Sequence, residues 1–201
     1  MSEPGDTKGD DYTTRLETLG NAGWKRVLDV QAPYRWNIRR LGLGFTLDIG
    51  CGIGRNLLHL DLQGVGVDHN ANSVAAAQRS GCTAFTSEDF ARSEYARPSC
   101  FDSLLLAHVV EHMSLEQACD LVSQHLGFVR TGGKVVLIAP QEAGYRSDET
   151  HLEFMDFEKL ESIFARVGVT HEHSYSFPFP RAVGRIFPHN EFVVVGRRPA
   201  E

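Results

Sequence analysis

The sequence predicts an α/β fold in which a doubly wound parallel sheet carries helices on both faces. Short apolar runs alternate with segments of helical spacing, and a glycine-rich turn, LDIGCGIGRN at residues 47–56, follows the first of these runs. With 201 residues the chain has the size of one ordinary domain. We therefore expect one domain over residues 11–201, preceded by a polar, disordered tail at residues 1–10.

Two helices are expected before the sheet and are predicted to cap it. Residues 13–28 and 32–40 have helical spacing, and Gly42 follows the second segment. The aromatic anchors of this region are Trp24, Tyr34 and Trp36.

Five strands and the helices between them follow in order. The strands are expected at residues 45–49, 64–67, 83–85, 101–106 and 134–139. Ser114 and Gln117 form a capping box for a long helix that runs to Arg130, and Gly132 with Gly133 closes it. Asp156 caps a second helix that ends before Gly168. Residues 169–176 and 191–196, joined by a proline-rich turn, are expected to form a terminal hairpin.

The glycine turn predicts a binding site for a small ligand. Gly50, Gly52 and Gly54 lie between a strand and a helix, where a ligand can approach the backbone without meeting a Cβ. A dinucleotide fingerprint has the spacing G-x-G-x-x-G, whereas here the third glycine comes one residue early and Arg55 follows it. This departure argues against a nicotinamide cofactor. A tight turn that binds nothing is the alternative.

Two acidic segments follow the next two strands. Asp68 comes about 20 residues after Asp48, where a carboxylate can accept hydrogen bonds from both ribose hydroxyls. A solvated Asp at a strand end is the alternative. The segment SEDF at residues 87–90 offers an acidic side chain to an adenine amino group and an apolar ring, Phe90, beside the base.

Together these motifs resemble class I S-adenosylmethionine (SAM)-dependent methyltransferases. The resemblance rests on LDIGCGIGR, GVGVD, SEDF, FDSLLLAHVVEHM and RTGGKVVLIAP, taken in that order. It implies a Rossmann-like, seven-stranded sheet whose last strand is antiparallel, and direct transfer of the sulfonium methyl group to an acceptor held in line with it. The residues expected to bind the cofactor are Asp48, Gly50, Cys51, Gly52, Gly54, Asp68, His69, Glu88, Asp89, Phe90 and Ala107.

A second cluster of residues predicts where the chemistry occurs. His108, Glu111 and His112 share one face of the turn after the fourth strand, and His151 lies on the loop after the fifth. The pattern is similar to the E-x-x-E-H motif, with a later His, of plant small-RNA 2'-O-methyltransferases and to a related motif of ubiquinone-biosynthesis O-methyltransferases. These four residues are thus the expected catalytic residues and ligands of a divalent ion, Mg²⁺ or Mn²⁺, with one histidine left to accept a proton. His108 stands where the motif has Glu. A structural turn that binds no metal is the alternative.

The acceptor is predicted to be a hydroxyl of a sugar or oligosaccharide, because a divalent ion suits a diol or polyol. The loop at residues 141–153 adds the polar and aromatic side chains of Gln141, Glu142, Tyr145, Arg146 and Asp148. The layout also resembles sugar O-methyltransferases such as the methylmannose polysaccharide 1-O-methyltransferase. The alternatives are a metal-free methyltransferase acting on a quinone, phenol, amine or carboxylate, and a non-catalytic protein that binds the cofactor.

Composition limits the partners. The net charge of −6 disfavours nucleic acid, which clustered Lys and Arg would bind. No apolar run approaches the roughly 20 residues of a membrane span, and the four cysteines lack the spacing of a zinc or redox site. We expect a cytoplasmic monomer or homodimer with no membrane partner.

Overall fold

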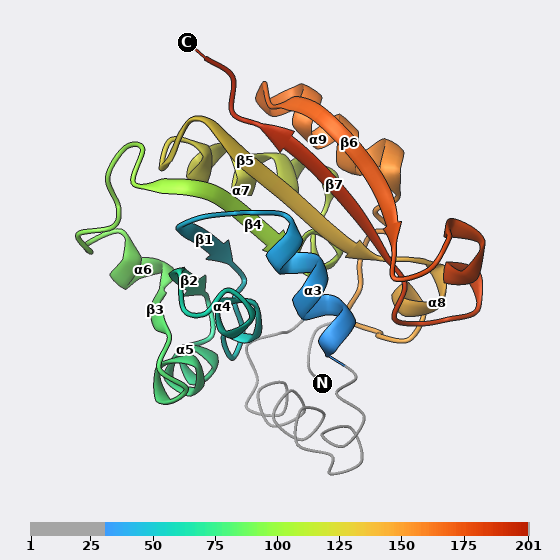
Figure 1. Ribbon diagram of the computed structural model, residues 1–201, viewed down its shortest axis with the longest axis horizontal. Helices are drawn as coiled ribbons and strands as arrows, with labels where there is room; N and C mark the ends of the chain where they lie inside the picture. Colours follow the sequence, from blue (N-terminus) through green and yellow to red (C-terminus); the bar gives the residue numbers. More distant parts are fainter. Residues whose placement is uncertain (1–30, 201) are drawn as a thin grey trace.

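A computed structural model describes residues 31–200 of the chain (Figure 1). Its centre is a seven-stranded sheet in the order β3-β2-β1-β4-β5-β7-β6. β1 to β5 are parallel, and β7 runs antiparallel to both of its neighbours, β5 and β6. The strands are β1 (Thr46–Ile49), β2 (Gly64–Asp68), β3 (Thr83–Thr86), β4 (Phe101–Ala107), β5 (Val129–Pro140), β6 (Thr170–Phe177) and β7 (Glu191–Arg197). The predicted fold class, including the antiparallel last strand, is confirmed.

Helices cover both faces of this sheet. In Figure 1, α3 lies across one face, and α7 and α9 lie on the other. The helices are α3 (Ala32–Arg40), α4 (Arg55–His59), α5 (Ala71–Arg79), α6 (Ser87–Phe90), α7 (Leu115–Leu126), α8 (Glu142–Tyr145) and α9 (Phe157–Val167), with the short 3₁₀ helices η1 (Val110–His112) and η2 (Arg181–Arg185). The residues of β1 and β2 are all buried, as expected for strands covered on both faces.

Three apolar clusters pack around the sheet, and the two with the most residues lie on its opposite faces. The larger lies under α7 and α9 and includes Leu104, Leu137 and Phe164. The smaller lies under α3 and includes Ile38, Val136 and Val193. Neighbouring residues of one strand thus pack against different helices, which fixes the register of β5 and β7.

The predicted caps are present. The side chain of Ser114 accepts from the N–H of Gln117, and the Gln117 side chain accepts in return from the N–H of Ser114. Asp156 caps α9, and Gly168 ends it in the left-handed conformation with φ +76°. These contacts satisfy N–H groups that have no partner inside a helix.

The predicted end of α7 was wrong. The helix ends at Leu126 rather than Arg130, because Val129 already pairs with Phe101 as the start of β5 and is fully buried there. A β-branched residue in a buried position favours the strand. Gly132 and Gly133 therefore lie within β5 instead of closing the helix.

The N-terminal predictions are tested only in part. α3 matches the predicted helix at residues 32–40. The helix predicted at residues 13–28, Trp24, and the disordered tail at residues 1–10 lie outside the described residues. Within residues 31–200, no helix combines the length and the apolar character needed to cross a membrane.

Candidate functional site

Four chain segments converge at one edge of the sheet. β1, β2, β4 and β5 are parallel, so the segments that follow their carboxyl ends meet there. These segments are the glycine loop (residues 50–54), the β2 end at Asp68, the turn from His108 to His112, and the loop of residues 141–153. The antiparallel β7 begins at the same edge, since Glu191 pairs with Pro140 at the end of β5.

The glycine loop has a backbone that other residues adopt only with strain. Gly50, Gly52 and Gly54 have φ values of +70°, +53° and +84°. A Cβ on Gly50 would lie 2.4 Å from the Val109 side chain, and one on Gly54 would lie 2.6 Å from the Cys82 sulfur. The loop therefore requires glycine at these positions for its conformation and for its close packing.

Asp68 ties the glycine loop to the end of β2. Its carboxylate accepts from the N–H of Gly52 at 2.8 Å and from the N–H of Asn70 at 2.8 Å. A carboxylate has about four acceptor positions, so lone pairs remain for hydroxyl groups. The bare backbone of the loop beside this carboxylate fits a nucleoside cofactor, with the loop holding the amino-acid part and Asp68 the ribose.

Asp48 lies under the loop with 1% of its surface exposed. Its carboxylate oxygens have no hydrogen bond of normal geometry from the described residues. Burial raises the pKa of Asp48 to about 8, with the Asn56 side chain acting against the shift and Asp68 adding to it.

The remaining cofactor candidates have different surroundings. His69 is exposed, with its ring 3.7 Å from the Asp68 carboxylate. Glu88 and Asp89 are exposed and face Arg92. Cys51 is buried, and burial raises the pKa of its thiol, so this residue contributes its backbone rather than a reactive sulfur.

The position of Phe90 does not match the prediction. Its ring is 3% exposed and packs against Phe101 and Phe128 in the larger core. An apolar ring that follows a short helix gains more by burial among other rings than by standing at the surface. The structure therefore gives Phe90 a packing role instead of a place beside the adenine.

Glu111, His112 and His151 form a compact group that could hold a metal ion, called here the Glu111 cluster. One ligand atom from each residue lies within 4.8 Å of the other two. The loop is anchored beside the turn because the N–H groups of Leu152 and Glu153 both donate to the carbonyl of Glu111, at 2.8 and 3.2 Å. This anchoring brings His151 to His112, with the two rings 4.9 Å apart.

Both histidines of the cluster have a fixed orientation. Nδ1 of His112 donates to the carbonyl of Thr150 at 3.1 Å, and Nδ1 of His151 donates to the carbonyl of Tyr145 at 2.7 Å. Each ring therefore keeps Nε2 as its lone-pair donor. Backbone carbonyls commonly hold metal-binding histidines in this manner. Glu111 is fully buried, and its carboxylate oxygens accept no hydrogen bond of normal geometry from the described residues, although the His108 ring lies 3.4 Å from one of them.

His108 does not join this cluster, contrary to the prediction. Nε2 lies 2.8 Å from a carboxylate oxygen of Glu191, and Nδ1 lies 3.4 Å from one of Glu111. Burial acts to lower the pKa of His108, but the two carboxylates raise it to about 10. Because both ring nitrogens face carboxylates, His108 directs neither of them at the two histidines of the Glu111 cluster, His112 and His151. Its backbone is left-handed, with φ +60°.

The sequence does not point to Glu191 as a site residue. Together with Ala107 and His108, it lines a small cavity between α3 and the sheet, to which Tyr34, Asn37 and Asn56 also contribute. The available signal was an acidic residue opening the otherwise apolar strand EFVVVG. Only the antiparallel course of β7 shows that this residue reaches the edge that carries the site.

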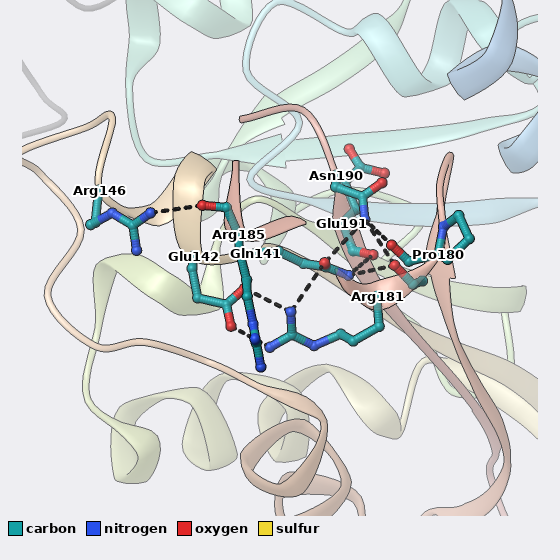
Figure 2. Close-up of polar contacts among 9 residues, drawn as sticks. Gln141, Glu142, Arg146, Pro180, Arg181, Arg185, Asn190 and Glu191 are labelled. Atoms are coloured by element: carbon teal, nitrogen blue, oxygen red, sulfur yellow. Dashed lines mark hydrogen bonds and ion pairs between the residues drawn. The ribbon is translucent and has the colours of Figure 1, made fainter. Parts of the chain in front are cut away.

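The loop predicted to contact the acceptor is partly committed to internal contacts (Figure 2). Gln141 is fully buried and donates to Ser176 and to the carbonyl of Glu191, and Asn190 donates to Gln141 at 3.0 Å. Arg181 donates to the Glu142 carboxylate at 2.7 Å and lowers its pKa. Of this loop, Tyr145 remains beside the cluster, with its ring stacked on that of His151.

Comparisons with known proteins agree with this geometry. The model of the methyltransferase domain family matches residues 47–137, which include the glycine loop, Asp68 and the turn from His108 to His112. None of the curated proteins matches the sequence. The matched segment, the glycine loop and the sheet order define the chain as a SAM-dependent methyltransferase of class I.

Solved structures share the fold at low sequence identity. The methyltransferase in complex with the Haloferax volcanii activator Trm112 is 15% identical with a TM-score of 0.69, over 99% of each chain. A SAM-dependent methyltransferase from Thermotoga maritima is 14% identical with a TM-score of 0.68, over 93% of this chain and 97% of that one. Geranyl diphosphate C-methyltransferase from Streptomyces coelicolor is 13% identical with a TM-score of 0.63, over 97% of this chain and 88% of that one.

Proposed function

We propose that this methyltransferase transfers the methyl group of SAM to a hydroxyl of a sugar or oligosaccharide, with the help of a divalent ion held by the Glu111 cluster. The observation that carries the proposal is a pair of imidazoles with fixed Nδ1–H groups beside a buried carboxylate, with one ligand atom of each residue within 4.8 Å of the others. Burying the Glu111 carboxylate is costly, and although His108 approaches it at 3.4 Å, a bound cation would offset more of that cost.

The ligand atoms of the Glu111 cluster suit a metal ion of intermediate hardness. One carboxylate and two imidazoles favour Mn²⁺ over Mg²⁺, which prefers oxygen ligands throughout. When bound, such an ion lowers the pKa of a coordinated acceptor hydroxyl. A structure of geranyl diphosphate C-methyltransferase, which shares the fold, contains Mg²⁺ and supports the compatibility of this fold with a divalent ion.

Residues of the chain would position the methyl donor and the acceptor. The glycine loop and Asp68 would hold SAM. The Glu111 cluster lies at the neighbouring strand end, where an acceptor oxygen can be set in line with the methyl group. Tyr145, stacked on His151 with centroids 5.4 Å apart, provides an aromatic ring beside the cluster. A ring of this kind can pack against the C–H face of a sugar, which is the basis for the proposed acceptor class.

A metal-free methyltransferase is the second candidate function. The observation that favours it is the 3.4 Å approach of His108 to Glu111, because a protonated histidine can compensate the buried carboxylate without any ion. In that case the turn shapes the acceptor pocket, and the acceptor is a quinone, phenol, amine or carboxylate.

Metal analysis combined with a methyl-transfer assay separates the two functions. The purified protein is tested for bound metal, and transfer to a panel of sugars and oligosaccharides is measured in EDTA and after addition of Mn²⁺ or Mg²⁺. We expect activity to vanish in EDTA and to return with Mn²⁺. His112→Ala is expected to stay inactive after this addition, whereas His171→Ala, on exposed β6, serves as the matched control. Full activity in EDTA would contradict the metal-assisted reaction.

A further inference from the structure

The cavity beneath α3 contains a carboxylate to which the reaction described above assigns no role. Glu191 enters it from β7 with 8% of its surface exposed. Asn56 in α4 and Ala107 at the end of β4 line the same cavity, and they flank the glycine loop and the turn after β4. Glu191 therefore stands at the end of the cofactor site where the amino-acid part and the sulfur of SAM are expected.

Carboxylates outnumber cationic side chains around this cavity. Glu191 and Glu111 both approach His108, at 2.8 and 3.4 Å, so a single imidazole is shared between two carboxylates. Tyr34 also lines the cavity. Burial is the larger cause that raises the pKa of its phenol, and the Glu191 carboxylate raises this pKa further. Within the described residues, no Lys or Arg lines the cavity.

We propose that Glu191 is a specificity-determining residue that favours SAM, whose sulfur is positively charged, over its product, whose sulfur is neutral. The sulfur of SAM is a sulfonium cation. During transfer the acceptor oxygen forms a bond to the methyl carbon, the carbon–sulfur bond breaks, and its electron pair stays on sulfur. The product S-adenosylhomocysteine is therefore neutral at sulfur, while the hydroxyl proton leaves to solvent. A carboxylate at this end of the cofactor site attracts the first molecule and not the second.

This proposal rests on the SAM-binding class of the chain and not on the metal. Its effect is on donor binding and product release: the product loses an attractive contact at the moment it forms. Because the readout is binding of cofactor-like ligands, it needs no acceptor and no metal. If the metal-assisted reaction were disproved, the proposal for Glu191 would still hold. If the proposal for Glu191 were disproved, the metal-assisted reaction would not be affected.

Isothermal titration calorimetry in EDTA tests the proposal. Sinefungin carries an amine where SAM carries the methylated sulfonium, so it reproduces the charge without reacting, and S-adenosylhomocysteine is the neutral comparison. The measured quantity is the ratio of their dissociation constants. We expect the wild-type protein to prefer sinefungin and Glu191→Gln to reduce that preference by about tenfold, with the affinity for S-adenosylhomocysteine nearly unchanged.

Two further variants keep the test decisive. Glu172→Gln makes the same charge change on β6, where Glu172 pairs with Arg197, and should leave the preference as in the wild type. His108→Asn removes the positive partner of Glu191 and should increase the preference for sinefungin, so it tests the idea even where Glu191→Gln fails to fold. An unchanged preference in both His108→Asn and Glu191→Gln would overturn the proposal. If Glu191→Gln weakened the binding of both ligands equally, the proposal would also be overturned, because Glu191 would then contact a part of the molecule that both ligands share.

Discussion

The two ends of the candidate site are built from different parts of the chain. At the cofactor end, the glycine loop offers its backbone and empty space, and the Asp68 carboxylate accepts from the loop N–H of Gly52. At the acceptor end, the Glu111 cluster consists of side chains brought from two distant segments, and backbone carbonyls orient its two histidines. The first end depends on the conformation of one turn. The second depends on how the loop of residues 141–153 packs against the turn after β4.

This difference predicts that the two ends fail independently. Changes in the glycine loop should remove the cofactor whatever happens at the cluster, because the strand-to-helix turn is local. Changes in the cluster should leave the cofactor bound, because its residues come after β4 and β5 rather than after β1 and β2. The predictions below test this independence, from the largest expected effect to the smallest.

Substitution in the glycine loop should have the largest effect. Gly50→Ala introduces a Cβ 2.4 Å from the Val109 side chain at a φ of +70°. We expect the affinity for S-adenosylhomocysteine to fall at least about 100-fold and the free energy of unfolding to fall by about 2 kcal/mol. Calorimetry and urea denaturation measure the two quantities. Gly127→Ala, where a Cβ meets nothing within 4 Å, is the control, and equal effects of both changes would refute the argument.

Loss of one imidazole should affect the other end alone. For His151→Ala we expect the dissociation constant for Mn²⁺ to rise at least about 100-fold, because a three-residue site loses a ligand. The affinity for S-adenosylhomocysteine should stay within about threefold of the wild type. Electron paramagnetic resonance of free Mn²⁺ measures the first quantity. Mn²⁺ binding that is the same in both proteins would exclude the Glu111 cluster as the metal site.

The buried carboxylate under the loop should appear in the pH dependence of stability. Because burial raises the folded-state pKa of Asp48 from 3.8 to about 8, folding takes up a proton between these values. The free energy of unfolding should therefore fall as pH rises through this window and become level above it. In the ligand-free protein, Asp48→Asn should be more stable than the wild type by at least about 1 kcal/mol at pH 8, with the difference vanishing below pH 4.

Urea denaturation of the two proteins across pH 4 to 9 makes this comparison. Groups other than Asp48 contribute equally to both proteins and cancel in the difference. If the stability difference between the two proteins did not depend on pH, Asp48 would be ionised in the folded protein, and its carboxylate would accept hydrogen bonds from water.

The sequence predicts the cofactor end better than the acceptor end for a physical reason. The glycine loop and Asp68 are defined by local backbone requirements and by the parallel strand order, which the pattern of apolar runs reveals. Glu111, His112 and His151 could be named from spacing, and the structure brings these three together. His108 could not be assigned, because its partner Glu191 is separated from it by 83 residues. Phe90 and the end of α7 were misassigned because burial in the core, which no local pattern reports, decided both.

Cys51 should give the smallest effect and is the sharpest test of the cofactor end. Its N–H donates to the carbonyl of Val67 at 3.2 Å, while its side chain is buried beside Gly66 and Leu57. If the loop acts through its backbone, Cys51→Ala should lower the free energy of unfolding by about 1 kcal/mol through lost packing. The affinity for S-adenosylhomocysteine should change less than threefold. A tenfold loss of affinity at unchanged stability would instead give the Cys51 side chain a direct part in binding, and the contrast between a backbone-built and a side-chain-built end would no longer hold.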